Sequence, residues 1–293
     1  MLHEISFPGL GIGPFTFDGV AFEMGSLQVR WYGVIICLGM ILAYTYAWTR
    51  AKYEGIKTDD LIDLALVLLI CGIAGARLYY VIFEIDAYLI KGTNVFDSIW
   101  KSLVAMLSIQ NGGLAIYGGI IGGGIGAYVY SRVKRIRFPV VADVIAPSLM
   151  IGQMVGRFGN FVNAEAHGGV TTLPWRMKIA TLYPNPDGSY FTDVMNALEY
   201  HPTFLYESLW NLVGFIAIAV LYKKKKFNGQ WILSYFAWYG LGRFMIEGLR
   251  TDSLMLGPVR VSQMLSAILF AGAVTLLVMG FLKAKKQTAA VEE

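Results

Sequence analysis

The chain has 293 residues, of which 56% are hydrophobic and 15% are charged, and its formal net charge is +4. A typical soluble domain carries about 25% charged residues, so this composition excludes an ordinary soluble protein and predicts an integral membrane protein. The three histidines and two cysteines show no metal-ligand spacing, and we expect no metal, no other cofactor and no nucleic-acid partner.

The first 28 residues precede the first apolar run. They are rich in glycine and proline, and the first basic residue is Arg30, so a signal peptide with a basic leader is not expected. We interpret residues 1–28 as a non-helical extracytoplasmic arm that lies at a membrane surface.

Seven segments meet the length of about 20 mostly apolar residues that a transmembrane helix needs. They run over 29–49, 61–84, 112–131, 141–161, 203–222, 229–248 and 262–282. The prediction is an all-α polytopic membrane protein, a single seven-span domain over residues 1–293. The loop 162–202 between spans four and five is expected to form a small extracytoplasmic cap.

Basic residues predict the orientation of these spans, because cytoplasmic loops carry an excess of Lys and Arg. Fourteen Lys and Arg follow the odd-numbered spans, and six follow the even-numbered spans. The amino terminus is therefore expected outside and the carboxyl terminus in the cytoplasm. Asp143 falls near the cytoplasmic end of span four, and we interpret it as a structural cap.

Four arginines fall inside or at the edge of a span: Arg30, Arg77, Arg157 and Arg243. The predicted topology places all four toward the outer ends of their helices. An arginine at membrane depth costs about 2.5–3.5 kcal/mol on insertion scales, and such residues rarely face lipid. They are therefore expected to converge on an interior cavity that opens to the outer leaflet.

Carboxylates accompany these arginines at the ends of spans four, five and six, in Glu165, Glu207 and Glu247. The stretch "YGLGRFMIEGLR" places Tyr239, Arg243, Glu247 and Arg250 on one helical face. Arg157 and Asn160 share a face at a spacing of three.

Two readings of these charges are open. They could form a structural network of buried ion pairs that satisfy one another. They could also form a binding site for an anion at the outer face, a task that suits arginine because its planar fork grips phosphate through two hydrogen bonds.

Glycines in the third span recur at a four-residue spacing, at Gly118, Gly122 and Gly126. Small residues at this spacing let two membrane helices approach closely, so we expect them to serve packing. Cys37 and Cys71 lie inside apolar runs and are interpreted as inert small hydrophobic residues.

The stretch "GRFGNFVNAEAHG" closely resembles the signature G-R-x-G-N-F-x-N-x-E-x-x-G of the prolipoprotein diacylglyceryl transferase family. The resemblance extends over nearly the whole chain. The other motifs that match the family occur in the same order as in its members. They are "VRWYG", "GARLYYVIF", "NGGLAIYGGIIG", "HPTFLYE", "YGLGRFMIEGLR" and "VSQMLS".

The resemblance implies a multi-pass enzyme of the bacterial plasma membrane that needs no cofactor. Such enzymes transfer the diacylglyceryl group of phosphatidylglycerol to the thiol of a lipobox cysteine, next to the signal peptide of a prolipoprotein. The products are a thioether-linked lipid and glycerol-1-phosphate. The implied partners are these two substrates and the lipid bilayer, with the active site facing the outer leaflet.

Residue roles carry over where the motifs match. The essential arginines correspond to Arg157 and Arg243, which are expected to hold the donor phosphate and to stabilise the charge that develops on it. Positions expected to bind phosphatidylglycerol with them are Tyr32, Asn160, Gly168 and Tyr239. Positions expected to support the site are Glu165, Glu207, Glu247, Arg77 and Asn163, with Glu165 and Glu247 fixing the arginines.

Tyr117 is a departure from the family pattern. Many members carry a histidine at this position, in an H-G-G-L pattern, and that histidine is a candidate base for the incoming thiol. A neutral phenol is a poor base and a competent hydrogen-bond donor. We therefore assign Tyr117 a catalytic role as a donor that positions substrate, with general base catalysis and simple aromatic packing as alternatives.

A channel or carrier for an organic anion is the alternative from another functional class. A carrier needs charges that are accessible from both membrane faces and often shows inverted repeats. Here the buried arginines are expected at one depth, and no repeat is visible in the sequence. Both points favour an enzyme with a one-sided site.

Overall fold

The computed structural model describes residues 2–25, 27–91, 93–109, 112–184, 190–192 and 198–292. The chain divides into two compact units. The first consists of Met1–Ala47 and Asp143–Glu293, and the second of Trp48–Ala142.

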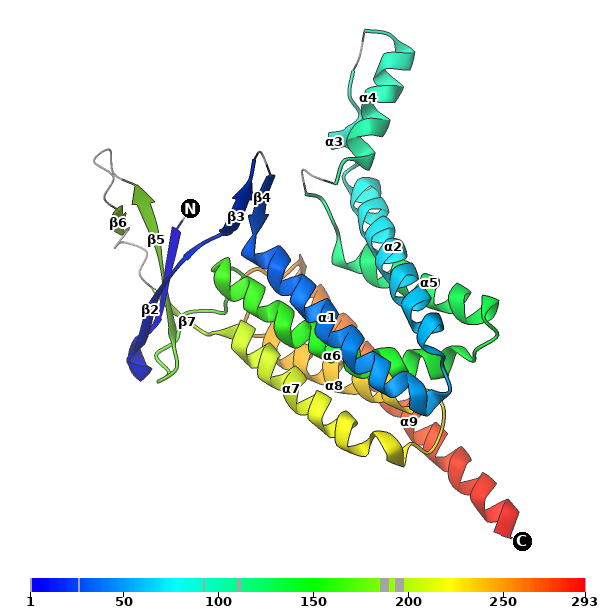
Figure 1. Cartoon of the computed structure of the whole chain (residues 1–293). Coiled ribbons are helices and arrows are strands. Elements are labelled where there is room, and N and C mark those ends of the chain that lie inside the picture. The colour runs from blue at the N-terminus through cyan, green and yellow to red at the C-terminus, as the bar shows by residue number, and fades with distance from the viewer. Residues whose placement is uncertain are drawn as a thin grey trace. The chain divides into compact units, whose positions relative to one another are not determined.

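Helices make up most of the first unit (Figure 1). They are most of α1 (Trp31–Ala51) and α6 (Phe138–Val162), together with α7 (Thr203–Leu221), α8 (Gln230–Glu247) and α9 (Val261–Glu292). Short 3-10 turns, Lys52–Glu54 and Tyr222–Lys224, follow α1 and α7. The chain forms helices here because these segments are long, apolar and helix-compatible.

Asp143 caps α8 from a different helix. Its fully buried carboxylate accepts hydrogen bonds from the backbone N–H groups of Gly229, Trp231 and Ile232, at 2.8, 2.8 and 3.1 Å. These are N–H groups of the first turn, which have no partner within the helix. The predicted role of Asp143 as a structural cap is confirmed.

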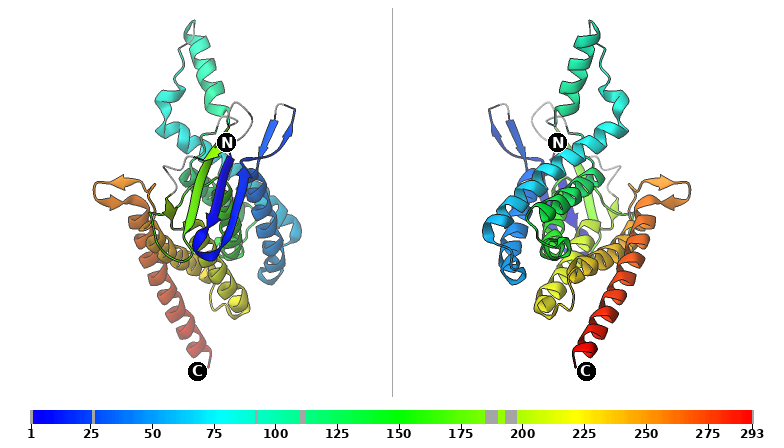
Figure 2. Two further views of the ribbon diagram at one scale, coloured as in Figure 1. Left: turned by 90° about the vertical axis from the view of Figure 1, so that its left-hand side faces the viewer. Right: turned by 90° about the vertical axis from the view of Figure 1, so that its right-hand side faces the viewer.

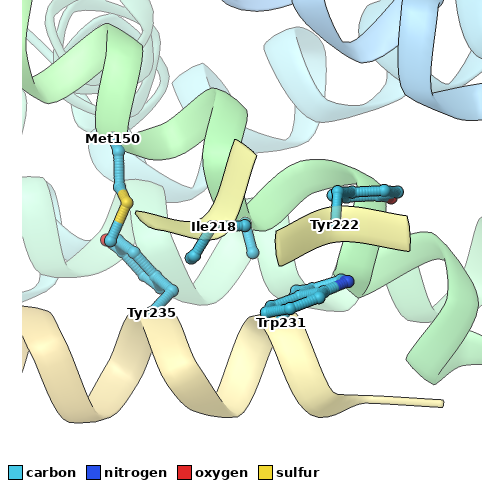
Figure 3. Packing of buried hydrophobic residues seen from close by; sticks show 6 residues of the cluster. Met150, Ile218, Tyr222, Trp231 and Tyr235 are labelled. Carbon is cyan, nitrogen blue, oxygen red and sulfur yellow. The ribbon is translucent and has the colours of Figure 1, made fainter. Parts of the chain in front are cut away.

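A cluster of buried side chains joins α6, α7 and α8 (Figure 3). It contains Met150 from α6, Ile218 from α7, Tyr222 from the turn after α7, and Trp231 and Tyr235 from α8. The rings of Tyr222 and Trp231 stack with their centroids 5.8 Å apart. This cluster fixes the three helices that carry the candidate site.

An antiparallel sheet joins the amino-terminal arm to the loop between α6 and α7 (Figures 1 and 2). Its strands are β1 (Leu2–Phe7), β2 (Ile12–Asp18), β5 (Met177–Pro184), β6 (Tyr190–Thr192) and β7 (Glu199–Tyr200). Their order is β2-β1-β5-β6, with β7 paired to β5. On the central strand, Ile5 lies opposite Phe15 on one side and Ile179 on the other, and it is fully buried.

This sheet corrects the purely helical prediction. Apart from a 3-10 turn at Pro8–Leu10, the described part of the arm 1–28 consists of strands and connecting turns, and β1 pairs with β5 of the distant segment 162–202. Its strands pair across more than 150 residues, so neither segment shows its partner locally. Two hairpins complete the strands of this unit, β3 (Val20–Met24) with β4 (Leu27–Arg30) and β8 (Met255–Leu256) with β9 (Val259–Arg260).

The second unit is built on α2 (Thr58–Phe83) and α5 (Ile116–Val133), with the short α3 (Ile85–Tyr88) and α4 (Val95–Leu107) between them. Gly75 of α2 faces Gly118 and Gly122 of α5, and a Cβ at Gly75 would come within 2.5 Å of the Gly118 carbonyl oxygen. The predicted packing role of these glycines is confirmed, because only glycine permits this approach.

Within the residues that the structure describes, five helices are long and apolar enough to cross a membrane: α1, α2, α6, α7 and α9. They coincide with five of the predicted spans, and the protein is a multi-pass membrane protein. The other two predicted spans are also helical, as α5 and α8, each 18 residues long. Glycine and tyrosine lower the hydropathy of α5, and polar residues lower that of α8.

Candidate active site

Glu207 is the centre of a buried charge cluster in the first unit. It lies near the start of α7, and its side chain is only 5% exposed. Its Oε2 lies 2.5 Å from Nη2 of Arg157 on α6. Its Oε1 lies 2.9 Å from Nη1 of Arg243 on α8 and 3.5 Å from Nη1 of Arg250. One carboxylate thus draws together arginines from three parts of the chain.

A second carboxylate, Glu247, fixes Arg243 from the same helix. Its Oε2 lies 2.6 Å from Nη2 of Arg243, and its side chain is 1% exposed. The cluster therefore contains three arginines and two buried carboxylates, and the half-exposed Asp252 pairs with Arg250 at its edge, so its formal charges balance. Three guanidinium groups converge on one carboxylate, and N–H donors of this kind suit an anionic ligand.

Arg250 is a member of the cluster that the predicted site residues do not include. The predicted helical stripe ended with Arg250, but the helix α8 ends at Glu247, so Arg250 lies outside it. Its guanidinium binds Asp252 through two hydrogen bonds of 2.9 and 2.6 Å. Burial alone would raise the pKa of Asp252, but the Arg250 hydrogen bonds and charge outweigh it and lower the pKa. The sequence feature that could have identified Arg250 as a site residue is its position three residues after Glu247.

Arg157 also connects to a chain of hydrogen bonds that starts at Asn160 in the last turn of α6 and continues beyond the helix. Its Nη1 donates to Oδ1 of Asn160 at 3.2 Å, and Nδ2 of Asn160 donates to Oε1 of Glu165 at 2.9 Å. Asn163 donates to the same carboxylate oxygen at 3.5 Å. Glu165 therefore holds Asn160, and acts on Arg157 only through that amide.

The backbone after α6 explains how Glu165 returns to the helix. Ala164 and Ala166 have φ angles of 52° and 57°, a left-handed conformation that costs a residue with a side chain about 1–2 kcal/mol. These two residues reverse the direction of the backbone after α6. The N–H of Glu165 then donates to the carbonyl of Asn160 at 3.0 Å.

A cavity of about 700 Å³ lies next to this turn. Glu165 and Asn163 line it together with Arg30 and with acidic side chains from the arm, Asp18 and Glu23. Arg30 is therefore the one of the four span arginines that lines this cavity, whereas Arg157 and Arg243 are paired with Glu207.

Two tyrosines expected to bind substrate lie on α1 and α8. The Tyr32 ring rests on Gly159, where a Cβ would come within 2.7 Å of its Cδ2 atom. Tyr239 precedes Arg243 by four residues on α8, and its ring stacks on Tyr235 with the centroids 5.8 Å apart.

Comparison with known proteins identifies the family to which these residues belong. The family model described as prolipoprotein diacylglyceryl transferase matches residues 19–279. The chain belongs to the prolipoprotein diacylglyceryl transferase family. It is therefore a transferase of a membrane-protein family.

Three relatives illustrate the similarity, each named phosphatidylglycerol–prolipoprotein diacylglyceryl transferase. The protein of Clostridioides difficile (strain 630) is 40% identical over 257 residues, which cover 88% of this chain and 93% of the relative. The protein of Listeria welshimeri is 43% identical over 274 residues, 94% of each chain. The protein of Clostridium kluyveri is 43% identical over 251 residues, 86% of this chain and 92% of the relative.

Two tryptophans hold α7, which carries Glu207, and α8, which carries Arg243, in register in this diacylglyceryl transferase. The indoles of Trp210 on α7 and Trp238 on α8 stack with centroids 4.4 Å apart. Each indole N–H donates to the backbone carbonyl of the other tryptophan, at 2.9 and 2.8 Å. Trp210 follows Glu207 by one helical turn, so this pair fixes the distance between Glu207 and Arg243. Sequence analysis missed the pair because neither tryptophan shows its partner locally.

Two predicted residues of the transferase lie in the second unit. Arg77 on α2 is buried, and its guanidinium donates to backbone carbonyls. The Tyr117 ring on α5 is 39% exposed and lies 6.4 Å from the Tyr79 ring. Asn111, the first residue of the predicted "NGGLAIYGG" motif, lies outside the described residues.

Gly168 of the family signature packs more tightly than its neighbour Gly169. Its N–H donates to the His201 carbonyl at 2.9 Å, and it forms a β-bridge with Arg250. A Cβ at Gly168 would come within 2.7 Å of the His201 Cβ and 3.0 Å of the Leu249 carbonyl. At Gly169 the nearest atom would be 3.9 Å away. Gly168 thus positions Arg250 through the backbone.

We expect Gly168→Ala to lower transfer on the order of tenfold or more, because the added methyl group displaces the backbone at Leu249 and Arg250 and a misplacement of about 1 Å can cost up to 10²-fold. Gly169→Ala is the matched control and is expected to remain near wild type. The initial rate of peptide lipidation at equal protein abundance is the measurement. Equal losses in both variants would contradict the steric role of Gly168.

Proposed function

We propose that this chain transfers the diacylglyceryl group of phosphatidylglycerol to the thiol of the lipobox cysteine of prolipoproteins, the first step of bacterial lipoprotein maturation. The observation that carries the proposal is the buried cluster around Glu207, in which three guanidinium groups converge on one carboxylate. The names of the relatives supply the two substrates.

The donor is an anionic lipid whose phosphate becomes the leaving group. The acceptor sulfur forms a bond to the glyceryl carbon, and the bond from that carbon to the phosphate oxygen breaks. The thiol proton is lost, and glycerol-1-phosphate leaves with an added negative charge. Arg157 and Arg243 stabilise that charge, since donors aimed at a developing charge are a large source of rate enhancement.

The two guanidinium groups have more N–H donors than their described contacts use, so further donors can bind the phosphate. A guanidinium has five N–H donors, and the contacts described for Arg157 and Arg243 each involve two nitrogens. The nucleophile belongs to the acceptor, of which a few per cent is thiolate near pH 7 at an ordinary cysteine pKa of about 8.5. In this chain Cys37 and Cys71 are free thiols, and neither has a role in the proposal.

The remaining predicted residues orient the two substrates. Tyr32, Asn160 and Tyr239 contact the headgroup glycerol of phosphatidylglycerol. Gly168 places Arg250, and Glu165, Asn163, Glu207 and Glu247 hold the donors in place. The carboxylates are assigned this role because Glu247 binds Arg243 and Glu165 accepts hydrogen bonds from Asn160 and Asn163.

We propose that α5 and α8 are the third and sixth of seven spans, with the amino terminus outside the cytoplasm. The excess of Lys and Arg after the odd-numbered spans supports this orientation, and the sheet of the arm and the 162–202 segment then forms the extracytoplasmic cap. The charge cluster faces the outer leaflet. A reporter fused at Lys286 should give a cytoplasmic signal. An extracytoplasmic signal would refute this topology.

Tyr117→Phe is expected to lower transfer by about tenfold, the loss of one hydrogen bond of about 1.4 kcal/mol, with an unchanged pH profile. The measurement is the transfer rate from pH 6 to 9, beside Tyr117→His. A wild-type rate in Tyr117→Phe would leave only ring packing. A nearly inactive Tyr117→Phe with an active Tyr117→His whose optimum is shifted to lower pH would instead support general base catalysis.

The proposed function is tested with purified protein in phosphatidylglycerol liposomes and a lipobox peptide. The expected product is a peptide whose mass has increased by the diacylglyceryl group, together with glycerol-1-phosphate. A peptide with serine in place of the cysteine and liposomes of phosphatidylethanolamine are the controls. Absence of product with the complete mixture, with uptake of an organic anion into the liposomes, would support the carrier alternative.

A further inference from the structure

Helix α4 of the second unit is amphipathic with its apolar face outward. Seven of its 13 residues are large apolar side chains that are 47–78% exposed, namely Val95, Phe96, Ile99, Trp100, Leu103, Val104 and Leu107. They recur at spacings of one, three and four, so they form a continuous stripe along one face. The opposite side carries the Asp97–Lys101 ion pair and the buried Ser102.

Polar contacts on that opposite side hold α4 to the rest of its unit. The Ser102 hydroxyl accepts a hydrogen bond from the N–H of Ile90 at 2.9 Å. Arg77 of α2 donates from Nε to the Met106 carbonyl at 2.8 Å. From Nη2 it donates to the carbonyls of Ala105 and Ser108, at 2.9 and 2.7 Å.

The remaining donors of Arg77 bind the chain that leads from α4 to α5. Its Nη1 donates to the carbonyls of Gly112 and Gly113, at 2.7 and 2.9 Å. All five guanidinium N–H groups thus bind backbone carbonyls, and the guanidinium also lies 5.0 Å from the Tyr88 ring centroid. The carbonyls at a helix carboxyl end carry partial negative charge, which offsets the charge of Arg77.

The place of Arg77 in α2 sets the depth of the end of α4. Arg77 precedes Phe83, the last residue of α2, by six residues, which is about 9 Å along the helix axis. Since α2 is long and apolar enough to span a membrane, carbonyls bound to Arg77 lie below the membrane surface. Irregular backbone is tolerated at that depth only where its polar groups are satisfied, and Arg77 satisfies them.

We propose that α4 is a membrane-inserted element, with its carboxyl-terminal half in the hydrocarbon of the leaflet where α2 ends. Leu103, Val104 and Leu107 contact acyl chains there. Ile99 and Trp100 lie nearer the headgroups, where tryptophan is favoured. The tip between α3 and α4 is farthest from α2 (Figures 1 and 2), which makes the amino-terminal end of α4 the shallower end.

Lipid is the occupant because the apolar stripe continues a surface that already faces lipid. The last turns of α2 expose Leu78, Ile82 and Phe83, and the first turn of α5 exposes Ile116. These residues belong to the same unit as α4 and flank it in the chain. The inserted face would thus join two lipid-facing helix surfaces, and the inference does not depend on the reaction that the protein catalyses.

Spin labels on single cysteines test the proposal in the full chain, in liposomes without acceptor peptide. The background carries Cys37→Ala and Cys71→Ala, and the labels are placed by Phe96→Cys, Leu103→Cys and Leu107→Cys. Lys101→Cys, on the opposite face, is the matched control. Collisions with oxygen, which concentrates in the bilayer, are compared with collisions with a water-soluble nickel chelate.

The oxygen-to-nickel collision ratio is expected to rise from position 96 to 103 to 107 and to be lowest at 101. Arg77→Lys, which keeps the charge but has only three donors, is expected to lower the ratio at 107. Equal nickel access at all four positions would overturn the proposal in favour of a helix in water. Shielding of the apolar positions from both reagents would overturn it in favour of a protein partner.

Discussion

Replacement of Arg157 or Arg243 by alanine is expected to remove nearly all transfer activity while the protein still inserts into the membrane. Each arginine forms an ion pair with Glu207 and has further N–H donors that can bind an anion. Loss of one preorganised donor to a developing charge typically lowers kcat by about 10²–10³-fold, and each alanine variant loses a whole guanidinium. Product formation per unit of membrane-inserted protein is the measurement.

The lysine variants separate charge from geometry. A lysine keeps the positive charge but is a point charge with no planar fork, so Arg157→Lys and Arg243→Lys are also expected to be severely impaired. Normal abundance with near-normal activity in Arg157→Lys would contradict binding of phosphate through two hydrogen bonds. Loss of protein from the membrane in the alanine variants would instead favour a purely structural network.

The long helices could be predicted from the sequence because their signal is local. An apolar run of about 20 residues indicates a span wherever it occurs, and helices are found at all seven predicted places. The close approach of α2 and α5 could be predicted as well, since the four-residue spacing of Gly118 and Gly122 indicates a close helix contact. The family signature then located Arg157, Asn160 and Glu165 within one hydrogen-bonded chain.

Features that depend on partners far apart in the chain could not be predicted. The pairing of Ile5 with Ile179 joins two distant segments into one sheet, and neither segment indicates its partner locally. The Trp210–Trp238 pair has the same origin. The central place of Glu207 was also hidden, because a lone carboxylate at the start of an apolar helix does not indicate how many arginines it binds.

Arg77 shows a limit of the rule that buried arginines mark a ligand site. The sequence suggested that all four span arginines converge on one cavity. The guanidinium of Arg77 is instead saturated by five backbone carbonyls of its own unit. A buried arginine can thus satisfy irregular backbone at membrane depth as well as bind an anion, and only its hydrogen-bond partners distinguish the two roles.

Glu207→Gln is expected to lower transfer by about 10²-fold or more, although glutamine keeps the size of the side chain. The neutral amide cannot hold Arg157, Arg243 and Arg250 together, and a misplacement of about 1 Å at a reacting centre can cost about 10²-fold. The buried cluster would also lose one of its two carboxylates, and an uncompensated buried charge typically costs about 3–5 kcal/mol. A lower thermal midpoint in detergent is therefore expected together with the loss of rate.

Asp252→Asn is the matched control for this variant, because Asp252 also binds Arg250 but its side chain is 50% exposed. Solvent reaches the Asp252 end of this pair, and solvent-exposed ion pairs are worth about 0–1 kcal/mol, so transfer should stay within about fivefold of wild type. Specific activity and thermal midpoint are measured on the same preparations. If Glu207→Gln lowers only the midpoint and the folded fraction transfers at the wild-type rate, the cluster is a structural network and the arginines are not held for the donor phosphate.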